Sequence, residues 1–185
     1  MAFEPTKAAT RPGSIIAGPV EDCLQAYQGE LNYLIGSLRR LGVPSRDLDD
    51  ALHEVFLVMY KRWDDYDRDR PLRPWLFGIA FRVASGQRRR GARELPSGGE
   101  EPEYEGDAPD QMLELSEGRR LLLRALASVP VDRRAVLVMH EVDEVSMRDI
   151  ADQLEIPLFT AYSRLRKARK ELDTALARLQ RGRLA

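Results

Sequence analysis

The sequence predicts an all-α chain with two small helical domains, a flexible acidic linker between them, and a helix-turn-helix (winged-helix-like) fold in the second domain. Apolar residues repeat at helical spacing along most of the chain, and no stretch shows the alternation typical of a strand. Residues 94–110 contain seven acidic residues and no basic one, and are rich in glycine and proline. Residues 146–170 read as two short helices joined by a tight turn.

The composition is that of a globular protein. The chain has 185 residues, of which 43% are hydrophobic and 32% are charged, which argues against a disordered or membrane-spanning class. No apolar run approaches the ~20 residues that a membrane-spanning helix needs, and the first residues do not have the pattern of a secretory signal. The single cysteine, Cys23, excludes an internal disulfide and suits a reducing compartment. We therefore expect a cytoplasmic protein without membrane insertion.

The first domain is expected to span residues 21–91, after a flexible tail at residues 1–20. Helices are predicted at residues 21–41, 47–63 and 74–90. The turn at residues 42–45 contains a glycine and a proline that end the first helix. Residues 64–73 form a charged loop, and Pro74 opens the third helix. Residues 92–110 are the predicted acidic linker.

The second domain is expected to span residues 111–185. Helices are predicted at about residues 112–128 and 132–142, with Asp132 as a helix cap. The helix-turn-helix follows: Ser146 and Asp149 have the spacing of a capping box, and Pro157 ends the first of its two helices. The second helix carries its apolar residues on one stripe, which is the face that packs on the core.

Two basic segments are hidden by a net charge of only −1. Residues 82–93 contain five arginines and no acid, and residues 158–185 contain eight basic residues against two acids. Two separated cationic surfaces favour binding to nucleic acid.

Polar and cationic side chains occupy one face of each basic helix. On the second helix of the helix-turn-helix they suit phosphates and base edges, although a solvated helix pair in a bundle remains the alternative. On helix 74–90, an aromatic and arginines three or four residues apart suit a nucleic-acid strand with bases to stack on, although a tryptophan is more often a core residue. By contrast, the acids of helix 47–63 would repel DNA and favour a protein partner; a merely solvated face explains them equally well.

These segments resemble the sigma-70 family of bacterial transcription initiation factors, and most closely its compact extracytoplasmic-function group. DLDDALHEVFLVMYKRWDDYD is similar to the polymerase-binding helix of the family, and RPLRPWLFGIAFRVASGQRRR resembles the segment that contacts the −10 promoter element. LASVPVDRRAVLVMHEVDEVSMRDIADQLEIPLFTAYSRLRKAR resembles the domain that reads the −35 element. The three matches occur in the family's order and cover about residues 24–170.

The resemblance implies a sigma factor that directs core RNA polymerase to specific promoters and assists DNA melting. Its implied partners are the polymerase core (the β′ clamp helices and the β subunit), promoter DNA and an anti-sigma factor; it implies no enzymatic activity and no cofactor. The positions that match polymerase-binding residues are Asp49, Asp50, Leu52, His53, Glu54, Phe56 and Leu57. Those that match the −10 segment and its base-capturing loop, together with neighbours on the same face, are Tyr66, Arg68, Arg73, Trp75, Arg82, Ser85 and Arg89. Those at the −35 surface are Leu158, Thr160, Ser163, Arg164, Lys167 and Lys170.

Within these sets, Tyr66 and Arg68 are expected to compensate for extruding a base from the melted strand. Arg164 is expected to contact a base edge, preferably guanine, while Lys167 and Lys170 bind phosphate.

The chain departs from the family pattern at several positions. His53 stands where the family usually has Gln, and Phe81-Arg82 where it often has Arg-Asn. Because Arg offers charge and donors whereas Asn can also accept, the preferred promoter sequence is expected to differ. Gly86 replaces a common Asp, and both Glu155 and Phe159 stand where the family usually has Gly.

Two other functions are compatible with a helix-turn-helix. A stand-alone regulator would bind duplex DNA tightly without polymerase. A helix-turn-helix recombinase would need a nucleophile with a supporting base, and the sequence offers no such constellation. His53 and His140 lie far apart without metal-ligand spacing, so no metal site is expected.

Overall fold

The computed structural model of the chain describes residues 19–94 and 116–184. Helices make up nearly all of these residues, and no β-strand occurs in the two ranges, which confirms the all-α prediction. The described part of the helix-turn-helix therefore has no β wing. No helix in the two ranges is long and apolar enough to cross a bilayer. Residues 1–18 of the predicted tail and residues 95–110 of the predicted linker lie outside the described residues. Pro19 and Val20, expected in the tail, instead begin the first helix.

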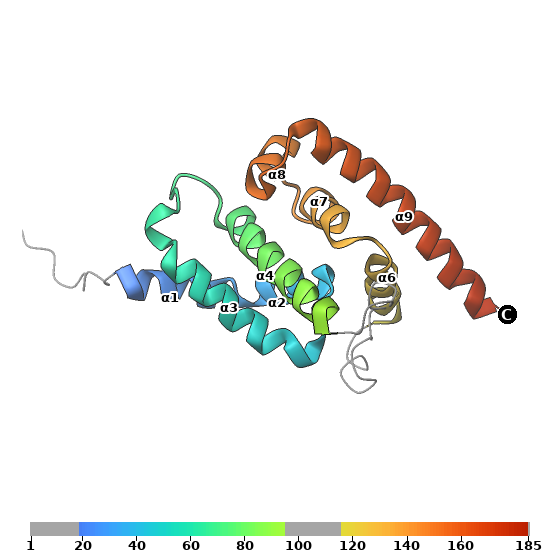
Figure 1. Cartoon of the computed structure of the whole chain (residues 1–185), viewed down its shortest axis with the longest axis horizontal. Helices are drawn as coiled ribbons and strands as arrows, with labels where there is room; N and C mark the ends of the chain where they lie inside the picture. The colour runs from blue at the N-terminus through green and yellow to red at the C-terminus, as the bar shows by residue number, and fades with distance from the viewer. Residues whose placement is uncertain (1–18, 95–115, 185) are drawn as a thin grey trace, which may run out of the picture.

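The first domain contains four α-helices (Figure 1). Short 3-10 turns at Ser45–Asp47 and Trp63–Asp65 flank the third of them. The helices are α1 (Pro19–Gly29), α2 (Leu31–Leu41), α3 (Leu48–Lys61) and α4 (Leu72–Glu94).

The single helix expected at residues 21–41 is wrong, because the chain breaks between α1 and α2. Gly29 ends α1, and glycine costs about 1 kcal/mol in a helix interior. Glu30 then has φ −106° and ψ 9°, outside the helical region, and its carboxylate lies 2.9 Å from Arg73 Nε. Glycine propensity and this long-range ion pair together favour the break.

Helix α4 is longer at both ends than expected. It begins at Leu72, so Pro74 lies in its first turn, where the missing proline N–H has no helical acceptor to lose. It continues to Glu94, so residues 92–94, expected as linker, are helical.

The second domain consists of α6 (Glu117–Ala127), α7 (Val131–Glu141), α8 (Met147–Leu154) and α9 (Leu158–Leu184). Ser116 caps α6 by accepting from the Arg119 backbone N–H. The predicted cap Asp132 is wrong: α7 begins at Val131 after Pro130, so Asp132 lies in the first turn. The predicted cap Ser146 is confirmed, because its Oγ accepts from the Asp149 N–H at 3.2 Å.

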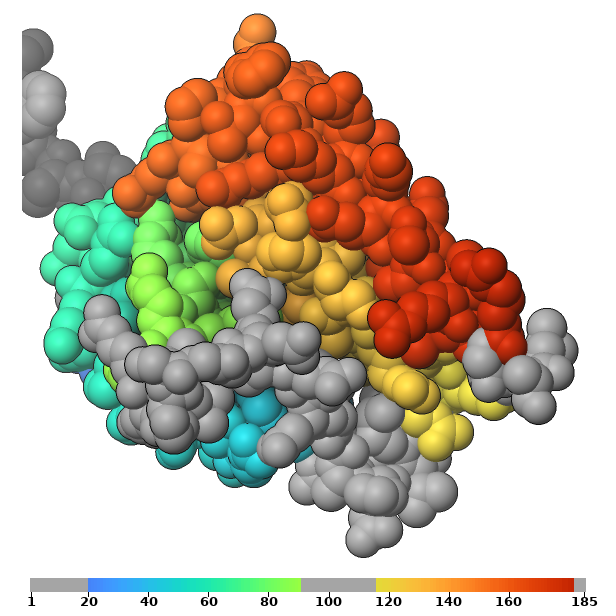
Figure 2. Space-filling view, turned by 45° about the vertical axis from the view of Figure 1, so that its right-hand side comes forward, coloured from blue at the N-terminus to red at the C-terminus, as the bar shows by residue number. Residues whose placement is uncertain are grey.

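The two domains pack directly on one another. Helix α4 contacts α7 and α8, and α2 contacts α6 and α7. Figure 2 shows the helix-turn-helix in orange resting on the green α4. The buried apolar side chains of both domains form one continuous cluster, whereas the sequence indicated only two modules on a tether.

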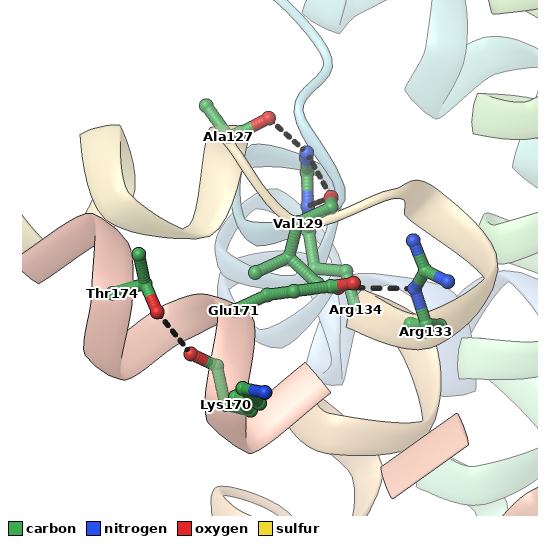
Figure 3. A network of polar contacts seen from close by, with 7 residues as sticks. All are labelled: Ala127, Val129, Arg133, Arg134, Lys170, Glu171 and Thr174. Carbon is green, nitrogen blue, oxygen red and sulfur yellow. Dashed lines mark hydrogen bonds and ion pairs between the residues drawn. The ribbon is translucent and has the colours of Figure 1, made fainter. Parts of the chain in front are cut away.

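A buried arginine joins the domains. Arg134 is 1% exposed. Its guanidinium donates to the carbonyl of Ala127 at the end of α6 (2.8 Å) and to that of Val129 just after it (2.8 Å and 3.0 Å) (Figure 3). It also donates to the Leu41 carbonyl at the end of α2, at 2.8 Å. Helix C-termini present unsatisfied carbonyls and a partial negative charge, so one cation caps two helices from different domains. Gly42, at φ +90°, lets the chain pass this guanidinium.

Candidate nucleic-acid and polymerase interfaces

The second helix of the helix-turn-helix, α9, presents a cationic face on the side opposite its buried stripe. Ala161, Leu165 and Ala168 are buried against the domain core. Of the predicted −35 residues, Lys167 and Lys170 are exposed, Thr160 and Ser163 are half-buried, and Leu158 is 39% exposed. Residues 158–170 contain no acidic residue, so this face attracts phosphate.

Arg164 lies at the edge of this face rather than at its centre. Its Nη2 is 3.5 Å from an Asp132 carboxylate oxygen, and its side chain is half-buried. The pair joins α9 to α7, a contact between residues 32 apart in sequence. An arginine held in this way reaches a base edge only after leaving its partner.

Three exposed residues of the α9 face were not among the predicted contacts. Phe159 is 84% exposed, Tyr162 is 56% exposed, and Arg166 is exposed. All three project away from the buried stripe, since they lie three or four residues apart along the helix. The helical period of the buried residues was the signal that could have found them.

The turn before α9 keeps its tight geometry without glycine. Glu155 has φ 55° and ψ 46°, the left-handed conformation that glycine adopts freely. The Glu155 N–H donates to the Asp152 carbonyl at 3.2 Å, and the next N–H donates to the Ala151 carbonyl at 3.0 Å. The turn therefore directs α9 so that its apolar stripe packs on the core, although the turn residue is not glycine.

An aromatic cluster joins the segment after α3 to the first turn of α4. The ring of Tyr66 is 4.9 Å from that of Trp75 and 5.7 Å from that of Trp63. Arg68 lies over the Trp63 ring at 5.5 Å, a cation–π contact. Burial raises the pKa of the Tyr66 hydroxyl, which donates to the Arg70 carbonyl. The predicted loop residues Tyr66 and Arg68 thus meet at an aromatic cluster, which the buried ring of Trp63 supports from the core.

The other predicted −10 residues do not share one open face. Arg73 Nε is 2.9 Å from a Glu30 carboxylate oxygen, and its guanidinium lies over the Tyr33 ring at 5.2 Å. Arg89 is exposed. The Ser85 hydroxyl is buried without a hydrogen-bond partner among the described residues.

Arg82 points at the helix-turn-helix. Its Nη2 donates to a Glu155 carboxylate oxygen at 2.5 Å and to the Gln153 carbonyl at 3.2 Å. A Cβ on Gly78, one turn earlier in α4, would lie 3.3 Å from the same carbonyl. The arginine expected to meet DNA therefore contacts the other domain in this structure.

A second polar contact joins the domains beside Arg73. The Tyr33 hydroxyl donates to Asp143 Oδ2 at 2.8 Å. Burial raises the pKa of Asp143, outweighing the hydrogen bond from Tyr33 and the charges of Arg40 and Arg73. Burial, with the Asp143 charge, also raises the pKa of Tyr33 far above its usual range. Protonation of Asp143 is thereby coupled to the packing of the domains.

The predicted polymerase-binding helix, α3, has four of its seven residues on one exposed face. Asp49, Asp50, His53 and Leu57 are all exposed, and their spacing places them on one side of the helix. This face combines acids with an apolar side chain, as a basic or mixed protein surface would require.

The remaining three residues of the set lie elsewhere on α3. Leu52 faces the core. Phe56 is half-buried, with its ring 5.0 Å from that of Tyr27. Glu54 is 2.9 Å from Arg90 Nη2 on α4. These three residues pack or pair with neighbouring elements and so fix the position of α3, rather than forming part of its exposed face.

Within residues 19–94 and 116–184, no group of three or more His, Cys, Asp or Glu side chains could hold a metal ion.

Solved structures with the same fold include CnrH in complex with the cytosolic domain of CnrY, with a TM-score of 0.57 and 24% identity over 86% of this chain and 90% of that chain. Another is the sigma factor RpoE in complex with the anti-sigma factor NepR from Bartonella quintana. It has a TM-score of 0.59 and 20% identity over 83% of this chain and 98% of that chain.

Curated relatives are similar over most of their length. The ECF RNA polymerase sigma-E factor of Escherichia coli K12 is 29% identical over 160 residues, covering 80% of this chain and 83% of the relative. The RNA polymerase sigma factor NccH of Alcaligenes xylosoxydans xylosoxydans is 28% identical over 158 residues, covering 82% and 85%.

Two family models match in order along the chain. Residues 26–94 match Sigma-70 region 2, which takes in the C-terminal end of α1 together with α2, α3 and α4. Residues 119–172 match Sigma-70 region 4, which includes the helix-turn-helix. With both regions present in the family's order, the chain belongs to the sigma-70 family of RNA polymerase sigma factors, in its extracytoplasmic-function group.

Proposed function

We propose that this chain is a dissociable specificity subunit that works in the cytoplasm, brings core RNA polymerase to a set of promoters and helps to open them. One observation carries the proposal: the chain combines an exposed acidic and apolar face on α3 with a cationic helix-turn-helix face on α9. The first suits a protein partner and the second suits DNA. The chain contributes binding energy and position, and the polymerase performs the chemistry.

The exposed residues of α3 are the proposed contacts with the β′ clamp helices. Asp49, Asp50 and His53 supply polar contacts, and Leu57 supplies an apolar one. Phe56 and Leu52 hold the helix in place, and Glu54 fixes α3 against α4 through Arg90. Reversing Asp49 and Asp50 therefore changes the surface without breaking the Glu54–Arg90 ion pair.

The α9 face is the proposed reader of the −35 element. Lys167 and Lys170 bind phosphate, while Arg164 leaves Asp132 to meet guanine. Thr160 and Ser163 add short polar contacts beside them, and Leu158 flanks the entry of the helix.

The aromatic cluster around Tyr66, Trp75 and Arg68 is the proposed site for a base extruded from the −10 element. Stacking is worth about 1–3 kcal/mol per base, which offsets the cost of unpairing. Arg73, Arg82 and Arg89 are proposed to bind the strand beside it. Holding both promoter elements through one polymerase-bound chain raises the effective concentration at each.

We also propose that an anti-sigma protein regulates the chain. One structural neighbour is a sigma factor held by an anti-sigma factor, and the compact two-domain fold resembles that neighbour.

Pull-down and promoter-library transcription with core polymerase test the function. Wild type should bind core polymerase and initiate on a subset of templates. Asp49→Lys with Asp50→Lys should lose both activities while keeping its helical circular dichroism. The control Glu21→Lys, an exposed acid on α1, should keep both activities. If the free chain shifts promoter duplexes as strongly without polymerase as with it, the chain is a stand-alone regulator and the proposal is wrong.

A further inference from the structure

The α9 face carries an apolar patch beside its cations. Phe159 is 84% exposed, Tyr162 is 56% exposed and Leu158 is 39% exposed. An exposed phenylalanine gains nothing from water and offers a DNA backbone no hydrogen bond. The patch lies at the N-terminal end of α9, which is the part of a recognition helix that meets base edges.

We infer that Phe159 and Tyr162 read thymine methyl groups in the major groove of the upstream element. Thymine is the only standard base that presents a methyl group there, and apolar side chains contact it. The neighbouring charges favour DNA over a protein as the occupant: Arg166, Lys167 and Lys170 are exposed, and residues 158–170 contain no acid. The inference rests on the proposed function and adds the class of base that the helix prefers.

A methyl-deletion selection tests this inference. The full chain with core polymerase is used to select binders from a random upstream duplex library, once made with thymine and once with uracil in its place. With thymine, wild type should enrich T at one or two positions, each worth about fourfold in binding. With uracil, that enrichment should disappear, because uracil keeps every hydrogen-bonding group and loses only the methyl.

Side-chain variants complete the cycle. Phe159→Ala combined with Tyr162→Ala should bind the thymine and uracil libraries alike. Lys167→Ala should bind both libraries more weakly and still prefer T. Equal preferences of wild type for thymine and uracil would overturn the inference and would leave a protein partner as the occupant of the patch. Failure to retain any duplex with polymerase would count against the proposed function instead.

A second, independent observation concerns the contact between α4 and the helix-turn-helix. Glu155 is held in a left-handed conformation (φ 55°), which is unfavourable for a residue with a Cβ. Its carboxylate accepts from Arg82, a residue proposed to bind DNA. A carboxylate and a phosphate offer a guanidinium similar pairs of oxygens. The Glu155 carboxylate therefore binds the Arg82 guanidinium in the place that a DNA phosphate would take.

The geometry points to a latch within the free chain. While the domains are closed, the turn of the helix-turn-helix covers Arg82, and binding of the −10 strand by α4 requires the domains to separate. The latch rests on the proposed role of Arg82, but not on how α9 reads bases.

Glu144 provides a matched control for the latch. It is a second glutamate with positive φ, at 54°, in the turn between α7 and α8. No ion pair or hydrogen bond joins its side chain to α4 among the described residues. Glycine at either position removes one negative charge and relieves the same backbone strain. Only Glu155→Gly removes the carboxylate partner of Arg82, which keeps its hydrogen bond to the Gln153 carbonyl.

Binding of fluorescent single-stranded DNA of random sequence to the free chain distinguishes the two variants. Glu155→Gly should bind about fivefold more tightly than wild type, the effect of losing one partly exposed ion pair. Glu144→Gly should stay close to wild type. Adding Arg82→Ala to Glu155→Gly should abolish the gain. Equal gains for both glycine variants would overturn the latch, whereas inactive wild type in transcription with core polymerase would count against the proposed function.

Discussion

Replacing Arg134 by methionine should uncouple the two domains. The methionine side chain keeps most of the apolar stem and removes the guanidinium. Three carbonyl oxygens, those of Leu41, Ala127 and Val129, then lose their donor. Two of these contacts are fully buried, so water does not readily replace the guanidinium.

The expected loss follows from these three acceptors. Leaving a buried polar group unsatisfied costs about 1–3 kcal/mol, so three carbonyls at the low end give about 3 kcal/mol. Arg169 is a control, since its Nε donates to Glu141 on α7 at 2.8 Å within the second domain. The side chains of that pair are about half exposed, and such pairs contribute at most about 1 kcal/mol.

Urea unfolding followed by circular dichroism measures the loss. Arg134→Met should lower the free energy of unfolding by about 3 kcal/mol, and it should increase the radius of gyration in small-angle scattering as the domains separate. Arg169→Met should cost no more than about 1 kcal/mol and leave the radius unchanged. Equal losses for the two variants would refute the assignment of Arg134 as a cap shared by both domains.

Three further predictions follow from the same geometry. Gly42→Ala should destabilise the chain by about 2 kcal/mol or more in urea unfolding, because φ is +90° and the new Cβ would lie 2.3 Å from Arg134 Nη1; an unchanged midpoint would contradict it. The pKa of Asp143 is raised in the folded chain, so wild type should be most stable relative to Asp143→Asn at acid pH, below the pKa of the unfolded chain. This difference in the free energy of unfolding should disappear as pH rises through the folded pKa. A difference that does not change with pH in urea unfolding would exclude this coupling. Arg164→Ala should relax preference at one upstream base pair, whereas Lys167→Ala should weaken binding to all sequences and reduce its salt dependence, which promoter-library selection at two salt concentrations can separate.

Local signals predicted most of the helices. The spacing of Ala161, Leu165 and Ala168 predicted the buried stripe of α9, and all three are buried. The cap at Ser146 depends on residues three positions apart, so it was also visible in the sequence. The break after Gly29 was missed because part of its cause is the distant Arg73, which holds Glu30.

Contacts between the domains could not be predicted from residue types. Arg134 belongs to a helix of mixed charge and reads as a surface residue, and only the convergence of two distant helix ends turns it into a buried cap. In the same way, the pattern of α4 assigns Arg82 to a nucleic-acid face and carries no sign of Glu155, 73 residues later. Pair interactions at such separations depend on tertiary packing, which periodicity does not encode.

The cap at Arg134 also bears on the order in which the protein is made. During synthesis the N-terminal half leaves the ribosome first, and the Leu41 carbonyl must wait for a donor 93 residues further along the chain. Until Arg134 has been made, the Leu41 carbonyl lacks this donor and the contact between the domains that it makes cannot form. Final compaction is thereby deferred to a late stage of translation, so a prematurely terminated product would expose surface that cellular proteases can recognise.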